Sequence, residues 1–358
     1  MSMGSDDHSA SVSGSGPWVA PGEPKEDRNP SADASKHCDD GTPETPSLGV
    51  AASPAPADLA AKAAPENDDE PQNTLTKKFT DAEWSALRKF RVIWCLSRRK
   101  ELTNSAIHLQ PMLPATFAEA FPDNPGASST PYILWGVTID PTEPKNAKVS
   151  VILMKFLRAR NLNPDEAKTM LISTLRWRQS FDVEGAMKEQ YPEEIFGKLG
   201  KIYGKDKQGH PVVYNLYGAI KDTSVVFDDI QRFLRWRVAF MERSIALLDF
   251  ETVDQAVQIH DYEGVGLFSR TENSKRAASE ATSIFQGHYP ELLTRKFFVN
   301  VPSFMTWIFW LFKPLLSSAT LDKMAVVGSG PRTIGTALLP IIDERELPKR
   351  YGGSADGF

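Results

Sequence analysis

Apolar and polar residues follow two different periods along this chain. Apolar residues recur at helical spacing in five segments, which are residues 80–96, 149–160, 164–180, 227–248 and 272–286. Four shorter apolar runs have the length and composition of β-strands, and they are residues 211–217, 256–262, 296–301 and 324–327. Because these strands alternate with helices, we expect an α/β fold with a mainly parallel sheet and right-handed crossovers.

Local signals mark the starts of two of these helices. Thr80 and Glu83 have the spacing of a capping box, in which the hydroxyl and the carboxylate each bind a backbone amide. Asn163, Pro164 and Glu166 supply an N-cap, a proline at the first helical position and an acidic residue in the first turn. Both helices should therefore begin at these residues.

Composition divides the chain into three parts. Residues 1–75 are rich in Ser, Pro, Ala, Asp and Gly and hold few large apolar residues. Such a segment cannot bury enough surface to offset the entropy lost on ordering, so we predict a disordered tail. A solvated tail with no specific role is the simpler interpretation, and a regulatory tail is the alternative. We expect an N-terminal helical region over 76–185, in which the Pro-rich stretch 101–148 forms short pieces packed on a core. An α/β domain should follow over 186–358.

Charge and cysteine content limit the classes of function. The 358 residues are 41% hydrophobic and 24% charged, with a formal net charge of -5, so no basic field predicts a nucleic-acid partner. Cys38 and Cys95 give neither a disulfide framework nor a metal-ligand spacing, which favours a reducing compartment. The first residues lack the basic and apolar regions of a signal peptide. We therefore expect a cytoplasmic protein.

The segment 304–316 is the most apolar in the chain, although Lys313 and Pro314 interrupt it. It is shorter than the roughly 18–20 apolar residues that span a bilayer. Apolar side chains cover nearly its whole circumference, whereas a surface helix has a polar face. It therefore fits either a buried core helix or a helix that lines a pocket on one side and touches lipid on the other, since Trp and Phe suit the membrane interface.

Motifs of common enzyme classes are missing from the sequence. There is no Walker A loop, no GxSxG and no HExxH, so we expect a protein that is not an enzyme. There is also no CxxCH motif, so any haem would be bound non-covalently.

Six segments match, in order, the motifs of a known family, and they are KFLRARNLNPDEAKTMLISTLRWRQSF (155–181), GKDKQGHPVVYNLYG (204–218), HDYEGV (260–265), FQGHYPELLTRKFFVNVPSF (285–304), LFKPLLSSATLDKMAVVG (311–328) and LPKRYGG (347–353). Over about 150–355 the chain thus resembles the CRAL-TRIO family of Sec14-like lipid transfer proteins. The resemblance implies an N-terminal helical subdomain and a CRAL-TRIO lipid-binding domain with a hydrophobic pocket and a gate helix. It also implies a phosphatidylinositol transfer protein, cytoplasmic and peripherally associated with the endoplasmic reticulum or microsomal membrane.

The resemblance also implies roles for individual residues. It assigns the gate and the membrane contact to four aromatic residues, Phe304, Trp307, Trp310 and Phe312. It assigns the lipid headgroup to Glu291, which can accept hydrogen bonds from inositol hydroxyls, and to Lys323, which can bind a phosphate. Without the resemblance, these two residues fit a surface ion pair or two unrelated solvated charges.

Polar residues also gather on one predicted strand. Gln258, His260 and Tyr262 share a face because side chains alternate along a strand. They approach the carboxyl end, where α/β sheets bind ligands, although a satisfied polar pair explains them equally well. The chain most resembles a fungal phosphatidylinositol-transfer branch of the family, which is also described as binding haem. This implies non-covalent ferric haem b with Tyr262 as the iron ligand and His260 as a second ligand or hydrogen-bond partner.

Three further residues match that haem site. Arg237 and Lys296 are basic and would support a tyrosinate or pair with haem propionates, and Tyr217 ends the preceding strand. Arg237 also fits a plain surface charge, because it belongs to a basic run with Arg232 and Arg235. The leading interpretation is a lipid carrier. The alternatives are a haem protein that senses haem or answers oxidant stress, and a peroxidase-like or catalase-like enzyme, for which no distal acid or base stands out.

Overall fold

The computed structural model of this chain describes residues 70–93, 110–143, 145–266, 271–302 and 323–358. All of them belong to one unit of the chain, from Ala63 to Phe358. Most of the predicted tail and the whole predicted gate segment lie outside the described residues. Among the described helices, none is both long and apolar enough to cross a bilayer.

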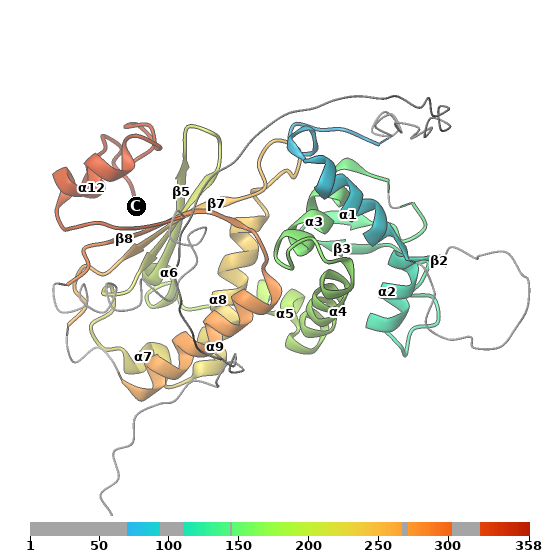
Figure 1. Cartoon of the computed structure of the whole chain (residues 1–358). Helices are drawn as coiled ribbons and strands as arrows, with labels where there is room; N and C mark the ends of the chain where they lie inside the picture. Colours follow the sequence, from blue (N-terminus) through green and yellow to red (C-terminus); the bar gives the residue numbers. More distant parts are fainter. Residues whose placement is uncertain (1–69, 94–109, 144, 267–270, 303–322) are drawn as a thin grey trace, which may run out of the picture. The chain divides into compact units, whose positions relative to one another are not determined.

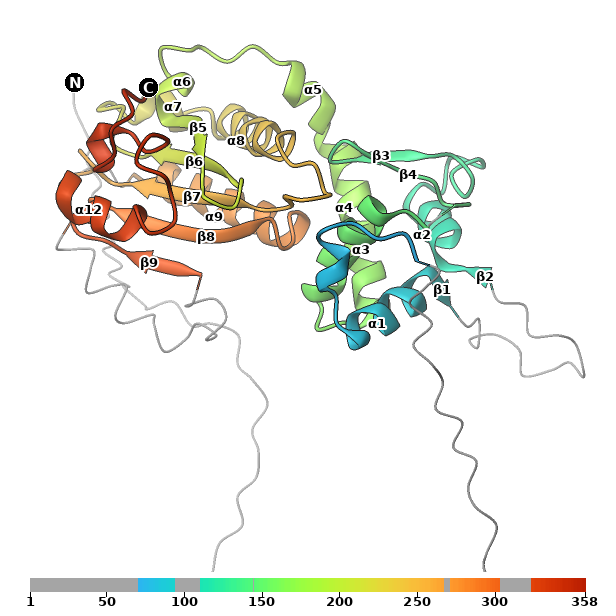
Figure 2. The same cartoon turned by 90° about the horizontal axis from the view of Figure 1, so that it is seen from above.

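A five-stranded sheet carries the C-terminal half of the chain. Its strands lie in the order β5, β6, β7, β8, β9, side by side in Figure 2. Their bounds are Gly200–Lys205, Pro211–Leu216, Ala256–Asp261, Leu293–Val299 and Met324–Val326. The ladders from β6 to β9 are parallel, and β5 pairs with β6 in the antiparallel sense. The mainly parallel sheet is confirmed, and the edge strand β5 is an addition that the apolar pattern did not predict.

Helices cover both faces of this sheet. The helices of this half are α6 (Phe196–Leu199), α7 (Ser224–Phe227), α8 (Ile230–Ile245), α9 (Glu272–His288) and α12 (Pro331–Leu338), with a 3-10 turn at Lys349–Tyr351. On one face Val213 packs with Trp236 and Phe240 of α8. On the other face Tyr214 packs with residues of α12 and of the C-terminal segment, so α8 and α12 lie on opposite sides of the sheet (Figure 1). Alternate residues of β6 thus pack into two separate hydrophobic cores, one on each face of the sheet.

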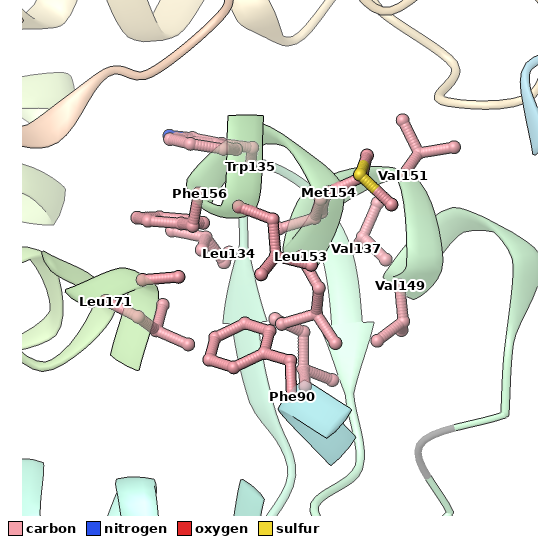
Figure 3. Packing of buried hydrophobic residues seen from close by; sticks show 14 of the residues in the cluster. Phe90, Leu134, Trp135, Val137, Val149, Val151, Leu153, Met154, Phe156 and Leu171 are labelled. Carbon is pink, nitrogen blue, oxygen red and sulfur yellow. The ribbon is translucent and has the colours of Figure 1, made fainter. Parts of the chain in front are cut away.

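The N-terminal region is a helical bundle with a small hairpin. Its elements are a 3-10 turn at Thr76–Lys78, α1 (Asp81–Arg91), β1 (Val92–Ile93), β2 (Gln110–Pro111), α2 (Met112–Ala120), β3 (Tyr132–Leu134), β4 (Val137–Ile139), α3 (Ala147–Arg158), α4 (Pro164–Phe181) and α5 (Val183–Lys188). The Pro-rich stretch holds α2 and the β3–β4 hairpin. Trp135 beside that hairpin stacks on Phe156 of α3, with ring centroids 5.8 Å apart, inside the core of Figure 3. The prediction of short pieces packed on a core is confirmed.

Both predicted helix starts are present as expected. Glu83 accepts a hydrogen bond from the Thr80 amide at 2.9 Å, and the Thr80 hydroxyl accepts one from the Glu83 amide at 3.2 Å. The Asn163 side chain accepts hydrogen bonds from the first amides of α4, with Pro164 at its first position. The capping bonds that the sequence predicted are therefore present at both helix starts.

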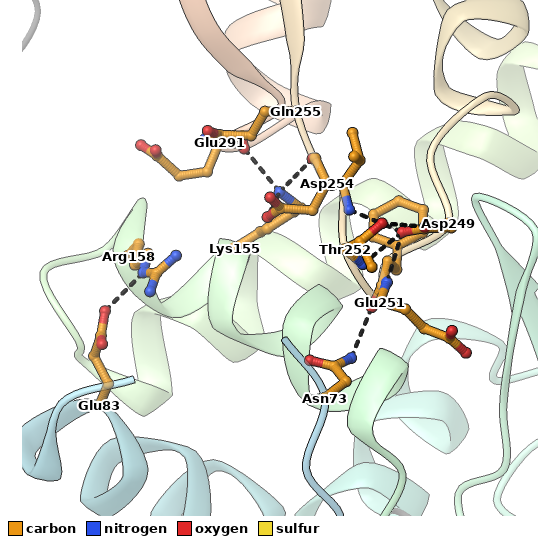
Figure 4. A network of polar contacts seen from close by, with 12 residues as sticks. Asn73, Glu83, Lys155, Arg158, Asp249, Glu251, Thr252, Asp254, Gln255 and Glu291 are labelled. Atoms are coloured by element: carbon orange, nitrogen blue, oxygen red, sulfur yellow. Dashed lines mark hydrogen bonds and ion pairs between the residues drawn. The ribbon is translucent and has the colours of Figure 1, made fainter. Parts of the chain in front are cut away.

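A buried lysine ties the helical region to the sheet. Lys155 on α3 is 1% exposed, and its ammonium group donates to the Asp254 carboxylate at 2.6 Å. It also donates to the backbone carbonyls of Asp254 at 2.8 Å and Glu291 at 2.9 Å, as Figure 4 shows. These partners directly precede β7 and β8, so one side chain fixes the starting points of both strands.

We expect Lys155→Met to lower the free energy of unfolding by about 3–5 kcal/mol, because it leaves the Asp254 carboxylate buried without its cation. Lys148→Met on the same helix is the matched control, since Lys148 pairs with Glu251 at 3.1 Å in a half-exposed setting, with side chains 39% and 56% exposed. That control should cost less than about 1 kcal/mol. Urea unfolding of both variants measures the difference. Equal losses would mean that the Lys155 pair is no more important than a surface pair.

Candidate functional site

A cavity of about 430 Å³ lies against the sheet face that α8 covers. Residues of β6, β7 and β8 form its floor, and residues of α7, α8 and α9 form its walls. Its apolar lining includes Val226, Phe227, Phe233, Trp236, Phe285 and Phe298. This volume and this lining are those of a site for a small, largely apolar ligand.

The five residues that sequence resemblance assigned to haem all line this one cavity, and they are Tyr217, Arg237, His260, Tyr262 and Lys296. Gln258 lines it too, so the expected alternation along β7 is confirmed for Gln258, His260 and Tyr262. Arg237 is 9% exposed, so it is a buried residue of the cavity wall and not a surface charge like its neighbours in the basic run. The roles of these residues stay predictions; their grouping is a property of the structure.

Hydrogen bonds hold His260 in one orientation. The Tyr217 hydroxyl donates to His260 Nδ1 at 2.6 Å, and His260 Nε2 donates to Gln258 Oε1 at 3.1 Å. Burial, with the positive charges of Lys296 and Arg237, holds the pKa of His260 well below 6.5. Burial also raises the pKa of Tyr217, and Arg237 alone opposes that shift. At neutral pH the pair is therefore a neutral imidazole and a neutral phenol.

Two cations face the same cavity without an acidic partner. No carboxylate within the described ranges forms an ion pair with Arg237 or Lys296. The Arg237 guanidinium lies 5.1 Å from the centroid of the Phe285 ring and 5.6 Å from that of Phe240. Burial and the charge of Arg237 lower the pKa of Lys296 to about 8. The cavity thus combines apolar walls with uncompensated positive charge, which suits an anionic or electron-rich group of a ligand.

Asn215 is a cavity residue that sequence reasoning missed. It is 2% exposed and lines the cavity, and its Nδ2 group has no hydrogen-bond partner within the described structure. A buried amide without an acceptor is costly, so a ligand oxygen would be its natural partner. The signal was present in the sequence, because Asn215 is the one polar side chain among the residues of the buried strand β6 apart from the Tyr214 hydroxyl.

The predicted headgroup residues lie near the amino ends of two neighbouring strands. Lys323 donates to the Glu291 carboxylate at 2.9 Å, and the side chains are 39% and 31% exposed. Neither residue is part of the cavity lining. They lie close to it, however, because the backbone amide of Lys296 donates to the Lys323 carbonyl at 2.7 Å. The surface ion pair that these two residues suggest without the family resemblance is therefore present. Its Lys323 is joined by a backbone hydrogen bond to the cavity residue Lys296.

The predicted gate residues Phe304, Trp307, Trp310 and Phe312 lie outside the described residues. Across the part of the chain that the structure describes, no group of three or more His, Cys, Asp or Glu side chains has the arrangement of a metal site. The chemistry of the described site therefore rests on tyrosine, histidine, lysine, arginine and amide groups.

A mainly parallel sheet with helices on both faces and a partly open apolar cavity is typical of α/β domains that bind a small ligand. Two family models match the chain, the CRAL/TRIO domain over residues 196–353 and the CRAL/TRIO N-terminal domain over residues 114–173. The chain therefore belongs to the CRAL-TRIO family.

Curated relatives support this assignment. Phosphatidylinositol transfer protein SFH5 of Cryptococcus neoformans var. neoformans serotype D (strain B-3501A) is 37% identical over 241 residues, which cover 62% of this chain and 79% of that protein. Patellin-6 of Arabidopsis thaliana is 31% identical over 302 residues, 82% of this chain and 70% of that protein. Phosphatidylinositol transfer protein sfh5 of Sclerotinia sclerotiorum is 37% identical over 238 residues, 62% of this chain and only 57% of that protein.

One solved structure supports the fold. The crystal structure of Sfh5 matches with a TM-score of 0.58 and 24% sequence identity, and the match covers 77% of this chain and 89% of that one. At this identity the likeness extends to the arrangement of helices and strands.

We expect His260 to stay neutral around pH 6.5, the midpoint of an ordinary histidine. In an NMR titration of the six histidines its ring signal should not shift there, and His260→Gln identifies that signal. His288, whose pKa burial lowers to about 4, should titrate only at lower pH. Because the unfolded chain binds these protons and the folded chain does not, stability should fall as the pH drops below about 6.5. A normal midpoint for His260 would contradict its burial between two cations.

Proposed function

We propose that this chain binds phosphatidylinositol and transfers it between membranes. The observation that carries the proposal is the apolar cavity inside the CRAL/TRIO domain, with the Glu291–Lys323 pair beside it. The names of the fungal relatives support the choice of lipid. Apolar cavity walls let a carrier shield acyl chains from water while the lipid leaves its bilayer.

The headgroup would bind where Glu291 and Lys323 now bind each other. The Lys323 ammonium would bind the phosphate, and the Glu291 carboxylate would accept hydrogen bonds from inositol hydroxyls. The ion pair holds both side chains in place, and its partial exposure makes it inexpensive to open. The acyl chains would then occupy the cavity that begins at Lys296.

A carrier of this kind works at a membrane surface. We infer a cytoplasmic protein that associates peripherally with the endoplasmic reticulum or microsomal membrane, with segment 304–316 as the gate. This proposal gives the chain no catalytic role: the lipid enters and leaves unchanged.

Lys323→Ala should lower phosphatidylinositol transfer between vesicles by about tenfold, the effect of losing roughly 1.4 kcal/mol of headgroup binding. A matched control is Lys349→Ala, which removes another exposed ion pair, the one with Asp356 at 2.6 Å, far along the chain from this site. The control should transfer at the wild-type rate, and both variants should unfold at the wild-type urea concentration. Normal transfer by a folded Lys323→Ala protein would remove Lys323 from the site, and a wild-type chain that moves no phosphatidylinositol would contradict the function itself.

A second candidate ligand of the same cavity is ferric haem b, favoured by the grouping of Tyr217, His260, Tyr262, Arg237 and Lys296 around one space. The Tyr262 ring lies 5.0 Å from that of Tyr217 and 6.4 Å from that of Phe298, at the carboxyl end of β7. The two cations favour a phenolate or carboxylates in this setting. Both nitrogens of His260 already make hydrogen bonds, so we assign the iron ligand to Tyr262 and a hydrogen-bonding role to His260. Bound haem would supply a redox-active iron.

Tyr262→Phe should abolish or change the Soret band of protein expressed with ample haem, because it removes the phenol oxygen and keeps the ring. The matched control is Tyr203→Phe on β5, whose ring packs in the core on the opposite face of the sheet. The control should keep the wild-type spectrum. A colourless wild-type protein, or an unchanged spectrum for Tyr262→Phe, would leave lipid as the sole proposed ligand.

A further inference from the structure

Lys296 has the surroundings of a reactive amine. It projects from β8 into an apolar cavity, and no carboxylate among the described residues pairs with it. Its ammonium lies 5.7 Å from the centroid of the Phe298 ring, and the positive charge of Arg237 acts on it. A lysine that is desolvated in an apolar pocket beside another cation loses its proton easily, and the neutral amine is a nucleophile for carbonyl carbons.

We propose that Lys296 captures long-chain aldehydes in the cavity by forming a reversible imine. The proposal rests on the proposed function in one respect, which is that the cavity takes up apolar chains. It goes beyond that function because it assigns covalent chemistry and a different class of ligand to the same space.

The reaction is balanced without any oxidant or reductant. The lone pair of Lys296 Nζ attacks the carbonyl carbon, the C=O π electrons move to the oxygen, and a proton passes from nitrogen to that oxygen. The resulting carbinolamine loses its hydroxyl as water while the C=N bond forms. One aldehyde and one amine thus give one imine and one water.

Other cavity groups fit this step. The unpartnered Nδ2 group of Asn215 is a donor for the oxygen as its negative charge develops. The neutral Tyr217–His260 pair lines the same cavity and carries exchangeable protons. Phe285 and Phe298 supply apolar surface in the cavity, against which the chain of the aldehyde would pack beside the imine.

The aldehyde is expected to carry a long apolar chain. Lys296 projects from the sheet floor, and Val226, Phe227 and Phe233 give the cavity a continuous apolar part on the helix side. A chain packed against these residues gains roughly 0.8 kcal/mol for each buried CH₂ group. A short aldehyde lacks that contribution and should react with Lys296 no more readily than with surface lysines.

The pH dependence follows from the charges around Lys296. The titratable or charged groups that line the cavity are Tyr217, Arg237, His260, Tyr262 and Lys275. With a pKa of about 8, Lys296 is about one-fifth neutral at pH 7.4, whereas an ordinary lysine is about one-thousandth neutral, a difference of roughly 200-fold. The pKa of Lys349 is shifted in the opposite direction, because its ion pair with Asp356 raises it.

The test is reductive trapping of hexadecanal with cyanoborohydride at pH 7.4, followed by intact mass and peptide mapping of the full-length protein. We expect one main adduct, on Lys296, with at least tenfold more label than on Lys349, and labelling that rises steeply from pH 7 to pH 9. With propanal in place of hexadecanal, Lys296 should carry no more label than Lys349. Lys296→Met and Lys296→Arg should lose the main adduct while circular dichroism shows an intact fold, and Lys349→Met should keep it.

Phosphatidylinositol transfer by the same preparations separates this inference from the carrier function. Normal transfer without a selective Lys296 adduct overturns the inference and leaves the carrier. A selective adduct without transfer supports the inference and contradicts the carrier. Label spread evenly over surface lysines, or full labelling of Lys296→Met, overturns the inference whatever the transfer rate.

Discussion

A buried arginine and a partly buried lysine face one apolar cavity with no carboxylate partner in the described structure, and the surrounding residues reduce the cost of removing these charges from water. Removing an ion from water costs several kcal/mol even after the protein relaxes. Arg237 recovers part of this from the rings of Trp236, Phe240 and Phe285, which lie 5.9, 5.6 and 5.1 Å from the guanidinium carbon. Lys296 avoids part of it by releasing its proton more easily, since its pKa is lowered to about 8. The cavity therefore keeps a positive potential that an acidic neighbour would have cancelled.

Different polar contacts fix the two ends of the central sheet. At the amino ends, Lys155 binds the segments that lead into β7 and β8. At the carboxyl end of β7, Asp261 is 1% exposed and accepts hydrogen bonds from the Tyr351 hydroxyl at 2.8 Å and from Asn300 at 2.8 Å, on the face away from the cavity. Because neighbours on a strand point to opposite faces, anchoring Asp261 fixes His260 and Tyr262 toward the cavity.

Much of the fold could be predicted from periodicity, and the exceptions have physical causes. Strands β6 to β9 were predicted within a few residues because they are apolar runs bounded by turn residues. Strand β5 was missed because it lies at the sheet edge, is only half-buried and carries two lysines and two glycines in its sequence GKIYGK. The β3–β4 hairpin was missed because prolines obscured its three-residue strands.

The site was less predictable than the fold. Alternation on β7 alone placed Gln258, His260 and Tyr262 on one face, but their meeting with Arg237 and Lys296 came from family resemblance and depends on tertiary packing. Helix α8 carries three arginines within six residues, and periodicity does not reveal which one faces the sheet. The structure separates them: Arg235 binds Glu189 at 2.6 Å near the surface, and Arg237 is buried in the cavity wall.

The proposed ligands would be thermodynamically linked because both would occupy the cavity that Lys296 lines. A headgroup held by Glu291 and Lys323 places the start of the acyl chains at the Lys296 end of the cavity, since the Lys323 carbonyl accepts from the Lys296 amide. A ligand bound at Tyr262, at the other end of the cavity floor, would also be stabilised by the positive charge of Lys296. Two ligands that each filled this cavity of about 430 Å³ would exclude each other. Each then weakens the apparent affinity of the other by the same factor, so lipid occupancy would itself report the presence of the second ligand.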